Sequence, residues 1–491
     1  MTSARERQLS FVFADSPVGG GRPGTPDVSG GKAWLLQRAK PKTAKDLATG
    51  GEADQDLMER IASIRNLATA LLNVACNKGA PGVDGRSVWE VVEASPKLLF
   101  KLRQALLDGG YRPGDIRRVW IPKPGGGQRG LGIPNVVDRW VQEAVRQVLE
   151  PIFEPHFHPS SHGFRPNRGA HTAIAEAKAH IAEGYGWVVD LDLSKFFDRV
   201  HHQRLLDRMN QRIADRRVTK LVKQMLKAKV VLPDGVRIPT HEGTPQGGPL
   251  SPLLSNIVLD ELDWELERRG LRFVRYADDA NIFVRSERAG HRVMDSTRRF
   301  IERKLRLQVN EDKSAVARPK SRHFLGFRFR ASGTGNVEVH LSQKTKQRMD
   351  ARIRELTPRT WGQPLPELFR RANLYLRGWI GYFRLCTEEA VPLLERFDAH
   401  IRRRIRAIIA QQKRKRPRYL FRHLLSRGVT RKAAARAAYR RCGPWKRSNL
   451  PGLTRAYPNR WFHARLIALG QTWYGFHPPR AVPRQGVLFD A

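Results

Sequence analysis

The sequence has few cysteines, and the three that occur, Cys76, Cys386 and Cys442, are widely separated. They form no pair with the spacing of a zinc site and no plausible disulfide framework, so neither can organise the fold. Apolar runs are short, and none approaches the roughly 20 residues that span a membrane. The N-terminus also lacks the pattern of a signal peptide. We therefore expect a protein without membrane attachment, in a reducing, cytoplasmic compartment.

Acidic residues are scarce, with 47 Asp and Glu against 89 Lys and Arg, which gives a net charge of +42. Such an excess opposes compaction by self-repulsion, and polyanionic partners are its usual reason in a large folded protein. Apolar residues make up 40% of the 491 positions, which is enough for hydrophobic cores and excludes a disordered chain. The composition favours a nucleic-acid-binding protein of roughly three domains.

Two of the scarce carboxylates, Asp278 and Asp279, are adjacent in the chain. They lie between apolar runs at 271–274 and 282–284, a pattern that predicts a β-hairpin with both aspartates at its tip. Adjacent anions repel each other unless a cation compensates them, and hard carboxylate oxygens suit Mg²⁺. Asp-Asp is also an ordinary turn sequence, so the pair alone does not establish a metal site.

A matching set of carboxylates lies upstream, in residues 187–198. Alternation along a strand places the apolar residues of this stretch on one face and Asp190 and Asp192 on the other. Two carboxylates on one strand face, inside an apolar run, are not typical of a core. From this pattern alone, either aspartate could bind a metal. Asp198 is expected to cap the helix that follows.

A basic hairpin and a Gly/Pro-rich loop complete the local signals. Residues 117–134 contain two short apolar runs around a Gly-rich turn, which predicts a hairpin with Lys123 and Arg129 projecting from it. These side chains could hold a triphosphate, and a general contact with nucleic acid is an equal alternative. The loop at 243–252 can bring its backbone close to a ligand because of its glycines.

Beyond about residue 340 the sequence predicts helices with a strongly basic character. Arginines flank an apolar stripe between 397 and 409, and basic and aromatic residues alternate between 445 and 465. A run of charge is often only a solvated face, but this mixture suits phosphate contact and base stacking. The candidates for nucleic-acid binding in the whole chain are Arg165, Arg402, Arg403, Arg406, Lys413, Arg414, Lys446 and Arg447.

In the order of its motifs, the chain resembles the reverse transcriptase/maturase proteins encoded by group II introns, from about residue 56 to 480. The motifs that carry the resemblance are Arg129 to Gly132, His162 to Arg165, Asp192 to Asp198, the Pro-Gln-Gly-Gly loop at 245–248, Tyr276 to Asp279, Asn310 to Ser314, and Phe324 to Gly326. Family members usually have proline where this chain has Gly130. Many also carry a Cys/His endonuclease domain, which we do not expect here because the cysteine pairs are missing.

The resemblance implies an α+β fold of the right-hand polymerase type. An antiparallel palm sheet would be followed by a helical thumb/maturase region and a basic C-terminal segment. The expected parts are a flexible basic leader at 1–55, fingers at 56–160, a palm at 161–335, a thumb/maturase domain at 336–430, and a DNA-binding-like segment at 431–491.

The resemblance also implies RNA-directed DNA synthesis with two Mg²⁺ ions. Matching to the family selects Asp192 rather than Asp190. The implied metal ligands are Asp192, Asp278, Asp279 and the carbonyl of Leu193.

Five further residues are implied to bind the nucleotide. Lys123 and Arg129 would hold the triphosphate, and Phe197 would lie beneath the sugar and exclude a 2′-hydroxyl. Gln246 would contact the template or the incoming nucleotide. Lys313 would protonate the leaving pyrophosphate.

The implied partners are structured intron RNA, primer and target DNA, and dNTPs, without a membrane. The sequence does not fix the oligomeric state. Two alternatives remain open at this point. One is a maturase that mainly binds and folds its intron RNA without catalysis, and the other is a related reverse transcriptase recruited to host repair or defence. The intact carboxylate set favours retained polymerase chemistry.

Overall fold

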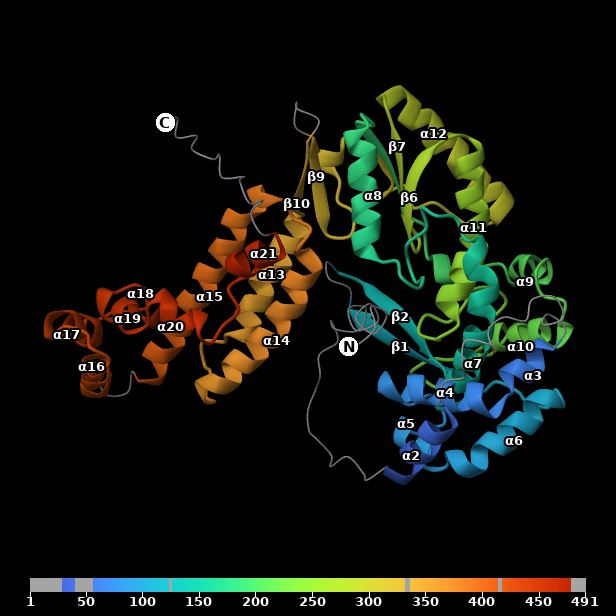
Figure 1. Ribbon diagram of the computed structural model, residues 1–491, viewed down its shortest axis with the longest axis horizontal. Helices are drawn as coiled ribbons and strands as arrows, with labels where there is room; N and C mark the ends of the chain where they lie inside the picture. The colour runs from blue at the N-terminus through green and yellow to red at the C-terminus, as the bar shows by residue number, and fades with distance from the viewer. Residues whose placement is uncertain (1–28, 40–55, 123–125, 332–335, 414–416, 478–491) are drawn as a thin grey trace, which may run out of the picture. The chain divides into compact units, whose positions relative to one another are not determined.

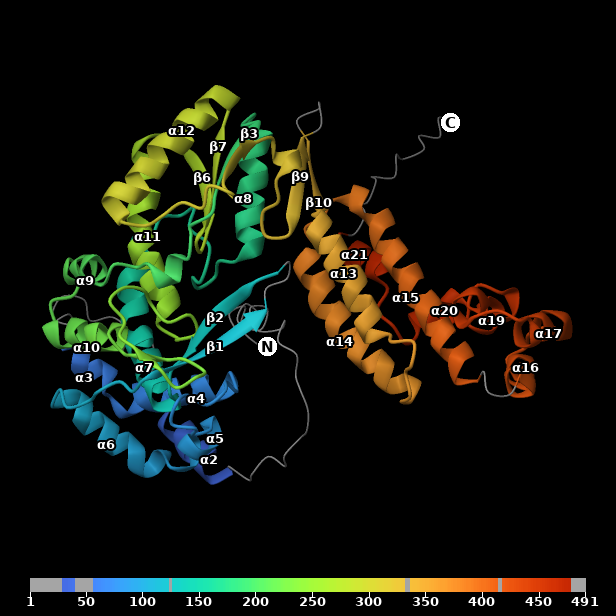
Figure 2. The ribbon, with the colours of Figure 1, turned by 180° about the vertical axis from the view of Figure 1, so that it is seen from behind.

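A computed structural model describes residues 29–39, 56–122, 126–331, 336–413 and 417–477 (Figures 1 and 2). The chain forms two compact units, the first from residues 1–180 and 185–317 and the second from 181–184 and 318–491. The sequence-based boundary at 335 differs from this division, because the residues after 317 group with the C-terminal helices. In the described part of the chain, no helix has both the length and the apolar character needed to cross a bilayer.

The N-terminal part of the first unit is helical. It contains α3 (Leu57–Ile61), α4 (Ile64–Cys76), α5 (Val88–Glu93), α6 (Ser95–Leu107) and α7 (Val136–Phe153). Apolar residues three and four positions apart give α4 a buried face, and α7 is buried on nearly all sides over residues 138–145. The fully buried indole of Trp140 on α7 donates to the Leu67 carbonyl of α4 at 2.6 Å. This pairing makes α4 and α7 the centre of the helical group.

A further helix precedes this group. In α2 (Ser29–Arg38), Leu35 is fully buried and the Trp34 ring meets Phe100 of α6 edge-on. The helix also contacts α4 and α5. The prediction of a flexible leader over 1–55 is therefore wrong for residues 29–38, where two large apolar side chains supply an anchor. The rest of the leader lies outside the described residues.

The predicted basic hairpin is present as β1 (Ile116–Pro122) and β2 (Gln128–Ile133), which pair antiparallel. Short strands β4 (Val230–Val231) and β5 (Arg237–Ile238) extend this sheet in the order β2-β1-β4-β5. Gly130 lies opposite Trp120 in the register. A Cβ atom at Gly130 would lie 3.0 Å from the Trp120 ring and 2.6 Å from Arg118 Nη1. The glycine thus makes room for two side chains of β1.

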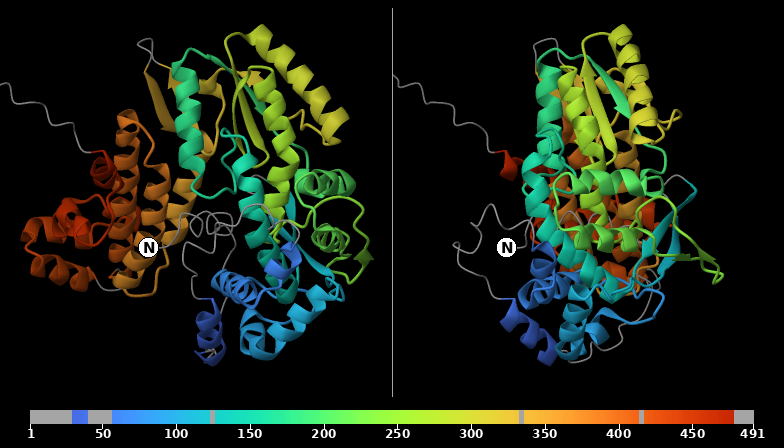
Figure 3. Two further views of the ribbon diagram at one scale, coloured as in Figure 1. Left: turned by 45° about the vertical axis from the view of Figure 1, so that its right-hand side comes forward. Right: turned by 90° about the vertical axis from the view of Figure 1, so that its right-hand side faces the viewer.

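The second sheet of this unit has four antiparallel strands in the order β6-β7-β3-β8. They are β6 (Arg272–Tyr276), β7 (Asp279–Val284), β3 (Trp187–Leu191) and β8 (Ala315–Ala317). Val189, Leu191 and Ile282 belong to the hydrophobic core, together with residues of α11 (Ser251–Arg268). Helix α12 (Glu287–Phe300) contacts β3, β7 and β8, and the views in Figure 3 show both helices alongside the strands. Val189 and Leu191 lie on one face of β3 in this core, as predicted. The strand ends before Asp192, and the other face carries buried Val188 as well as Asp190, so the predicted acidic face is not purely acidic.

The remaining elements of the unit connect these parts. They include α8 (Ala170–Ala182), a 3-10 turn at Phe196–Asp198, α9 (His202–Asn210) and α10 (Arg216–Leu226). The side chain of His201 accepts the Arg204 N–H and caps α9. The prediction that Asp198 is the cap is wrong, because the 3-10 turn places it too early in the chain.

The second unit begins with an antiparallel hairpin of β9 (Phe327–Ala331) and β10 (Val337–Leu341). Three longer helices follow, α13 (Gln343–Leu356), α14 (Leu365–Phe383) and α15 (Val391–Gln412). The short helices after them are α16 (Pro417–Ser426), α17 (Arg431–Tyr439), α18 (Pro444–Arg447), α19 (Pro451–Ala456), α20 (Asn459–His463) and α21 (Leu469–Phe476). The predicted helical character of the last third is confirmed.

Candidate active site

The two acidic stretches of the sequence meet at one end of the β6-β7-β3-β8 sheet. In the register of β3 and β7, Leu191 lies opposite Ala280. Strand β3 ends at Leu191, so Asp192 follows it at the end of the sheet where the turn residue Asp278 and the first residue of β7, Asp279, also lie. The charge of Asp192 raises the pKa of both hairpin aspartates, so the three carboxylates lie within electrostatic reach of one another. The structure therefore brings together the predicted residues Asp192, Asp278 and Asp279.

The turn between β6 and β7 consists of Ala277 and Asp278, because Tyr276 pairs with Asp279. The prediction that both aspartates form the tip is wrong for Asp279, which is the first residue of β7. Ala277 has a φ of 58°, in the left-handed region that two-residue hairpin turns use. Asp278 is thus held at the tip, while Asp279 shares a sheet face with Asp190.

The carboxylates of this cluster repel one another. Burial, and then repulsion by Asp190, Asp278 and Asp192, raises the pKa of Asp279 to about 7. Burial also raises the pKa of Asp278, and the charge of Asp192 adds to this effect. With several members ionised, the cluster carries an electrostatic cost that a bound divalent cation would remove.

The residues present fit a divalent cation. Their hard carboxylate oxygens are the ligands that Mg²⁺ prefers, and Mg²⁺ usually takes further ligands from substrate phosphates and water. Within the described residues, no three Asp, Glu, His or Cys side chains are arranged as a complete metal site. An ion at this position would therefore rely on substrate and water to complete its coordination.

Backbone hydrogen bonds fix the segment that carries Asp192. Asn310 N–H donates to the Asp192 carbonyl, and Ser194 N–H donates to the Gln308 carbonyl, both at 2.8 Å. Lys313 Nζ lies 3.5 Å from Asp192 Oδ1, so its positive charge stands beside the acidic cluster. The roles of Lys313 and of the Leu193 carbonyl stay predictions.

The predicted nucleotide-binding residues come from three segments that backbone hydrogen bonds join. Thr244 N–H donates to the Phe197 carbonyl at 2.6 Å, and Gly132 N–H donates to the Gln246 carbonyl at 2.9 Å. The Pro-Gln-Gly-Gly loop is therefore held between β2 and the turn after β3. Phe197 is partly buried, with its ring 5.2 Å from that of Phe196.

The basic hairpin brings positive charge to the same place. Arg129 is exposed on β2. Its positive charge opposes the rise in the pKa of Asp278, so Arg129 lies within electrostatic reach of the cluster. Arg118 Nη1 lies 3.9 Å from Asp198 Oδ1 and donates to the Gly130 carbonyl. Lys123, the other predicted triphosphate ligand, lies outside the described residues.

The segment before α8 packs directly against the turn of the acidic hairpin. His162 N–H donates to the Arg275 carbonyl, and Arg275 N–H donates to the Ser160 carbonyl, both at 2.9 Å. A Cβ atom on Gly163 would lie 2.3 Å from the backbone nitrogen of Ala277. Only glycine permits this approach, which gives a physical reason for the glycine of the His162–Arg165 motif.

Three arginines predicted to bind nucleic acid are buried, and their guanidinium groups bond inside the protein. Arg165 pairs with Glu154 and donates to two carbonyls of its own unit. Arg406 donates twice to the Tyr457 carbonyl. Arg447 donates to the carbonyls of Ala438, Arg440 and Cys442. These internal hydrogen bonds favour a structural role for the three arginines, which residue type alone does not reveal.

The remaining basic candidates are more accessible. Lys446 is exposed, and Arg402, Arg403 and Lys413 are half-buried. The Arg403 guanidinium carbon lies 3.8 Å from the ring centre of Trp445. This cation–π contact joins α15 to the exposed aromatic residue of the C-terminal segment. Arg414 lies outside the described residues.

The burial of the Arg275 side chain next to the acidic hairpin turn was not predicted from the sequence. Alternation along β6 puts it on the same face as Phe273, which is buried in the core, so the pattern itself placed a positive charge inside. A charged residue on a strand face that is otherwise apolar was the available signal.

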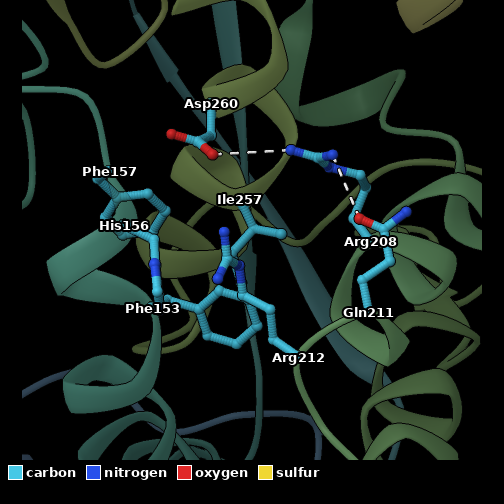
Figure 4. Close-up of a pocket in the computed structure, with 8 residues that line it drawn as sticks. All are labelled: Phe153, His156, Phe157, Arg208, Gln211, Arg212, Ile257 and Asp260. Carbon is cyan, nitrogen blue, oxygen red and sulfur yellow. Dashed lines mark hydrogen bonds and ion pairs between the residues drawn. The ribbon is translucent and has the colours of Figure 1, made fainter. Parts of the chain in front are cut away.

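A cavity of about 240 Å³ lies apart from the acidic cluster, between the C-terminal end of α7 and helices α9 and α11 (Figure 4). Its lining residues are Phe153, His156, Phe157, Arg208, Gln211, Arg212, Ile257 and Asp260. Burial, with added repulsion from Asp263, raises the pKa of Asp260 to about 6. The cavity contains none of the predicted site residues.

Comparison with known families identifies both parts of the described chain. Residues 121–329 match the reverse transcriptase (RNA-dependent DNA polymerase) family, and residues 346–428 match the maturase-specific domain of group II introns. The first match covers the end of β1, the whole of β2 and the whole acidic sheet. The class of protein that fold and site define is therefore an RNA-directed DNA polymerase, which in general depends on divalent metal ions and acts on RNA and DNA.

Individual relatives show to which family of RNA-directed DNA polymerases the chain belongs. "Protein YkfC" of Escherichia coli (strain K12) is 36% identical over 317 residues, which cover 55% of this chain and 83% of that protein. "Group II intron-encoded protein LtrA" of Lactococcus lactis subsp. cremoris is 31% identical over 320 residues, covering 52% of this chain and 53% of LtrA. The chain thus spans about half the length of LtrA. It belongs to the group II intron reverse transcriptase/maturase family.

Among solved structures, one chain of a partial Cas6-RT-Cas1–Cas2 complex is similar at 22% identity and a TM-score of 0.33. The match covers 50% of this chain and 42% of the other. A likeness this distant adds nothing to the argument from the site.

Proposed function

We propose that this protein copies an RNA template into DNA by two-metal nucleotidyl transfer at the end of the β6-β7-β3-β8 sheet. Asp192 and Asp278 would hold the metal ions in this proposal, with Asp279 beside them and the Leu193 carbonyl as a further oxygen donor. The observation that carries it is the convergence of these carboxylates, whose mutual repulsion favours a bound cation. Mg²⁺ is the natural ion for such ligands.

Bound Mg²⁺ would activate the primer 3′-hydroxyl and stabilise the departing pyrophosphate. The chain's own residues orient the other groups. Arg129 and Lys123 hold the triphosphate through charge-assisted hydrogen bonds. Phe197 packs against the sugar, where a 2′-hydroxyl would collide with the ring.

Two further residues act near the nucleotide. Gln246 contacts the template or the incoming nucleotide from its loop. Lys313, beside Asp192, donates a proton to the leaving pyrophosphate.

The proposed partners are structured intron RNA, a DNA primer and target, and dNTPs. The exposed basic residues of the second unit, Lys446 with Arg402, Arg403 and Lys413, would contact phosphates. Trp445, with Arg403 on its ring, offers a surface on which a base could stack. Binding the intron in this way would also assist its splicing.

The direct test is the substitution Asp278→Ala. We expect RNA-templated DNA synthesis to fall by at least about 10³-fold, because loss of a metal ligand would weaken the stabilisation of charge in the transition state. Binding of intron RNA, measured by filter retention, should stay within about twofold of wild type, because Asp278 makes no phosphate contact.

The matched control is Asp234→Ala, which removes an exposed aspartate from another hairpin turn, between β4 and β5. It should leave synthesis unchanged. Equal dNTP incorporation by the Asp278→Ala protein and the wild type would refute the proposal.

A second candidate function is that of a maturase that promotes splicing without polymerisation. The match of residues 346–428 to the maturase-specific domain supports this role, and the two activities can coexist. Splicing of the intron in the presence of the Asp278→Ala protein separates them. Splicing retained with synthesis lost would assign the roles to different parts of the chain.

A further inference from the structure

The most completely buried charge in the acidic hairpin belongs to Arg275, on β6 two residues before the turn. Its side chain is 1% exposed, and its partner Asp263 on α11 is fully buried. Arg275 Nε and Nη2 donate to the two carboxylate oxygens of Asp263 at 2.7 and 2.5 Å. A buried guanidinium group is tolerated only with such pairing, so the position is a costly one for the fold to maintain.

The same guanidinium group reaches three other acceptors. Nη2 also donates to Ser161 Oγ at 2.7 Å, and Nη1 donates to Asn256 Oδ1 at 3.1 Å. Nη1 has a second acceptor in the Ala277 carbonyl, at 2.9 Å. One side chain therefore joins α11, the segment before α8 and the turn of the acidic hairpin.

The hydrogen bond from Arg275 to the Ala277 carbonyl affects the residue that precedes Asp278, a proposed metal ligand. Ala277 is the left-handed residue of the turn, and its carbonyl belongs to the peptide group that leads into Asp278. A non-glycine residue keeps this conformation only where its surroundings hold it. Here the holding contacts are the Arg275 bond on one side and the close approach of Gly163 on the other.

We infer that Arg275 is a positioning residue for the polymerase reaction, which fixes the Ala277 carbonyl and thereby aims the Asp278 carboxylate at the metal position. The inference rests on the proposed function in one respect, the role of Asp278 as a metal ligand. Arg275 itself touches neither substrate nor metal. Its effect is exerted through the peptide bond between Ala277 and Asp278.

Arginine is suited to this task in a way that lysine is not. The guanidinium group offers five N–H donors in a rigid plane, and four separate residues accept from it here. An ammonium group at the same place could keep its charge opposite Asp263. It would lack the planar fork that reaches Ala277 and Asn256 as well.

The test is Arg275→Lys, which retains the buried charge and removes the fork. We expect the Mg²⁺ concentration for half-maximal primer extension to rise about tenfold, the effect of losing one charge-assisted hydrogen bond. Saturating Mg²⁺ should restore much of the rate, while KM for dNTP changes less. The half-maximal concentration does not depend on how much of the sample is active.

A second measurement follows metal binding without catalysis. Mn²⁺ titration of the protein with primer–template, followed by electron paramagnetic resonance, should show a matching loss of affinity in Arg275→Lys. The matched control is Arg204→Lys on α9, whose Nη2 donates to both carboxylate oxygens of Glu261 on helix α11. This control should leave the Mg²⁺ requirement and the Mn²⁺ affinity at wild-type values.

Ser161→Ala serves if Arg275→Lys does not fold, because it removes one acceptor without changing charge. We expect a smaller rise of the Mg²⁺ requirement in this variant, about two- to threefold. Unchanged metal dependence in a folded Arg275 or Ser161 variant would show that the network is only structural and would overturn the inference. Absence of DNA synthesis by the wild type would instead refute the proposed function.

Discussion

The acidic end of the first unit's sheet and the basic second unit use charge in opposite ways. At the sheet end, Asp192, Asp278 and Asp279 lie together, and repulsion with burial raises the pKa of the last to about 7. In the second unit, buried Arg406 and Arg447 each donate to backbone carbonyls of their own fold. Carboxylates of one sign are left to repel at the first place, whereas these two guanidinium groups bond to carbonyls inside the fold at the second.

The difference shows that the partners of a charged group indicate function better than its residue type does. Like charges kept close together favour a ligand of the opposite sign. Charges that bond inside the fold contribute to stability instead. This criterion separates Lys446 from its neighbour Arg447, although both have the same role predicted from the sequence.

The largest effect is expected for Arg447→Met. The buried carbonyl of Ala438 and the part-buried carbonyls of Arg440 and Cys442 would lose their donor, and a buried unsatisfied group costs about 1–3 kcal/mol. We expect the free energy of unfolding of the second unit to fall by about 3–5 kcal/mol in denaturant titrations. Lys446→Met, one residue away and exposed, is the control and should change it by less than about 0.5 kcal/mol. Equal stability of the two variants would contradict the claim that Arg447, unlike Lys446, contributes to the stability of the fold.

An effect of opposite sign and smaller size is expected for Asp279→Asn. The folded-state pKa of Asp279 is raised to about 7 from an ordinary 3.8, so the stability it contributes is complete below pH 4 and is lost as the pH rises through 7. Asparagine does not ionise and avoids this loss. The metal-free variant should therefore be more stable than wild type at pH 8, by about 1–3 kcal/mol after allowance for partial exposure.

Thermal unfolding at pH 5, 6.5 and 8 with a chelator measures this gain, which should grow between pH 5 and 7 and then level off. Added Mg²⁺ should stabilise the wild type more than the variant at pH 8. A variant less stable than wild type at pH 8 would mean that the cluster is not under electrostatic repulsion.

The smallest effect concerns nucleic-acid binding by the exposed basic residues. Lys446→Met should reduce the magnitude of the slope of log K against log salt for RNA binding by about 0.7–0.9, because one phosphate contact is lost. A folded Arg447 variant, for instance Arg447→Lys, should leave the slope unchanged. A reduced slope in the Arg447 variant alone would reverse the assignment of the two residues.

The sequence predicted much of the first unit, because its signals are local. Period-two alternation placed Asp190 and Asp192 on one face of β3, and the basic hairpin was read from two short apolar runs. The meeting of Asp192 with Asp278 required the family resemblance, since strand register between residues so far apart has no local signal. The position of Asp279 was missed because one residue decides whether an aspartate lies in a turn or a strand.

The basic candidates were predicted less well for a physical reason. Whether Arg165 faces solvent depends on carbonyls at 158 and 161 and on Glu154, which only the folded backbone brings within reach. The docking of α2 also escaped prediction, because Trp34 and Leu35 stand in a segment whose composition is typical of a flexible leader. In both cases tertiary contacts decided what local sequence could not.

The pairing of Gly130 with Trp120 links the two strands of the basic hairpin. A Cβ atom at Gly130 would lie 3.0 Å from the indole and 2.6 Å from Arg118 Nη1, so a larger residue there would force both side chains of β1 aside. A transplant of β2 alone into another enzyme should therefore fail where the two strands moved together succeed.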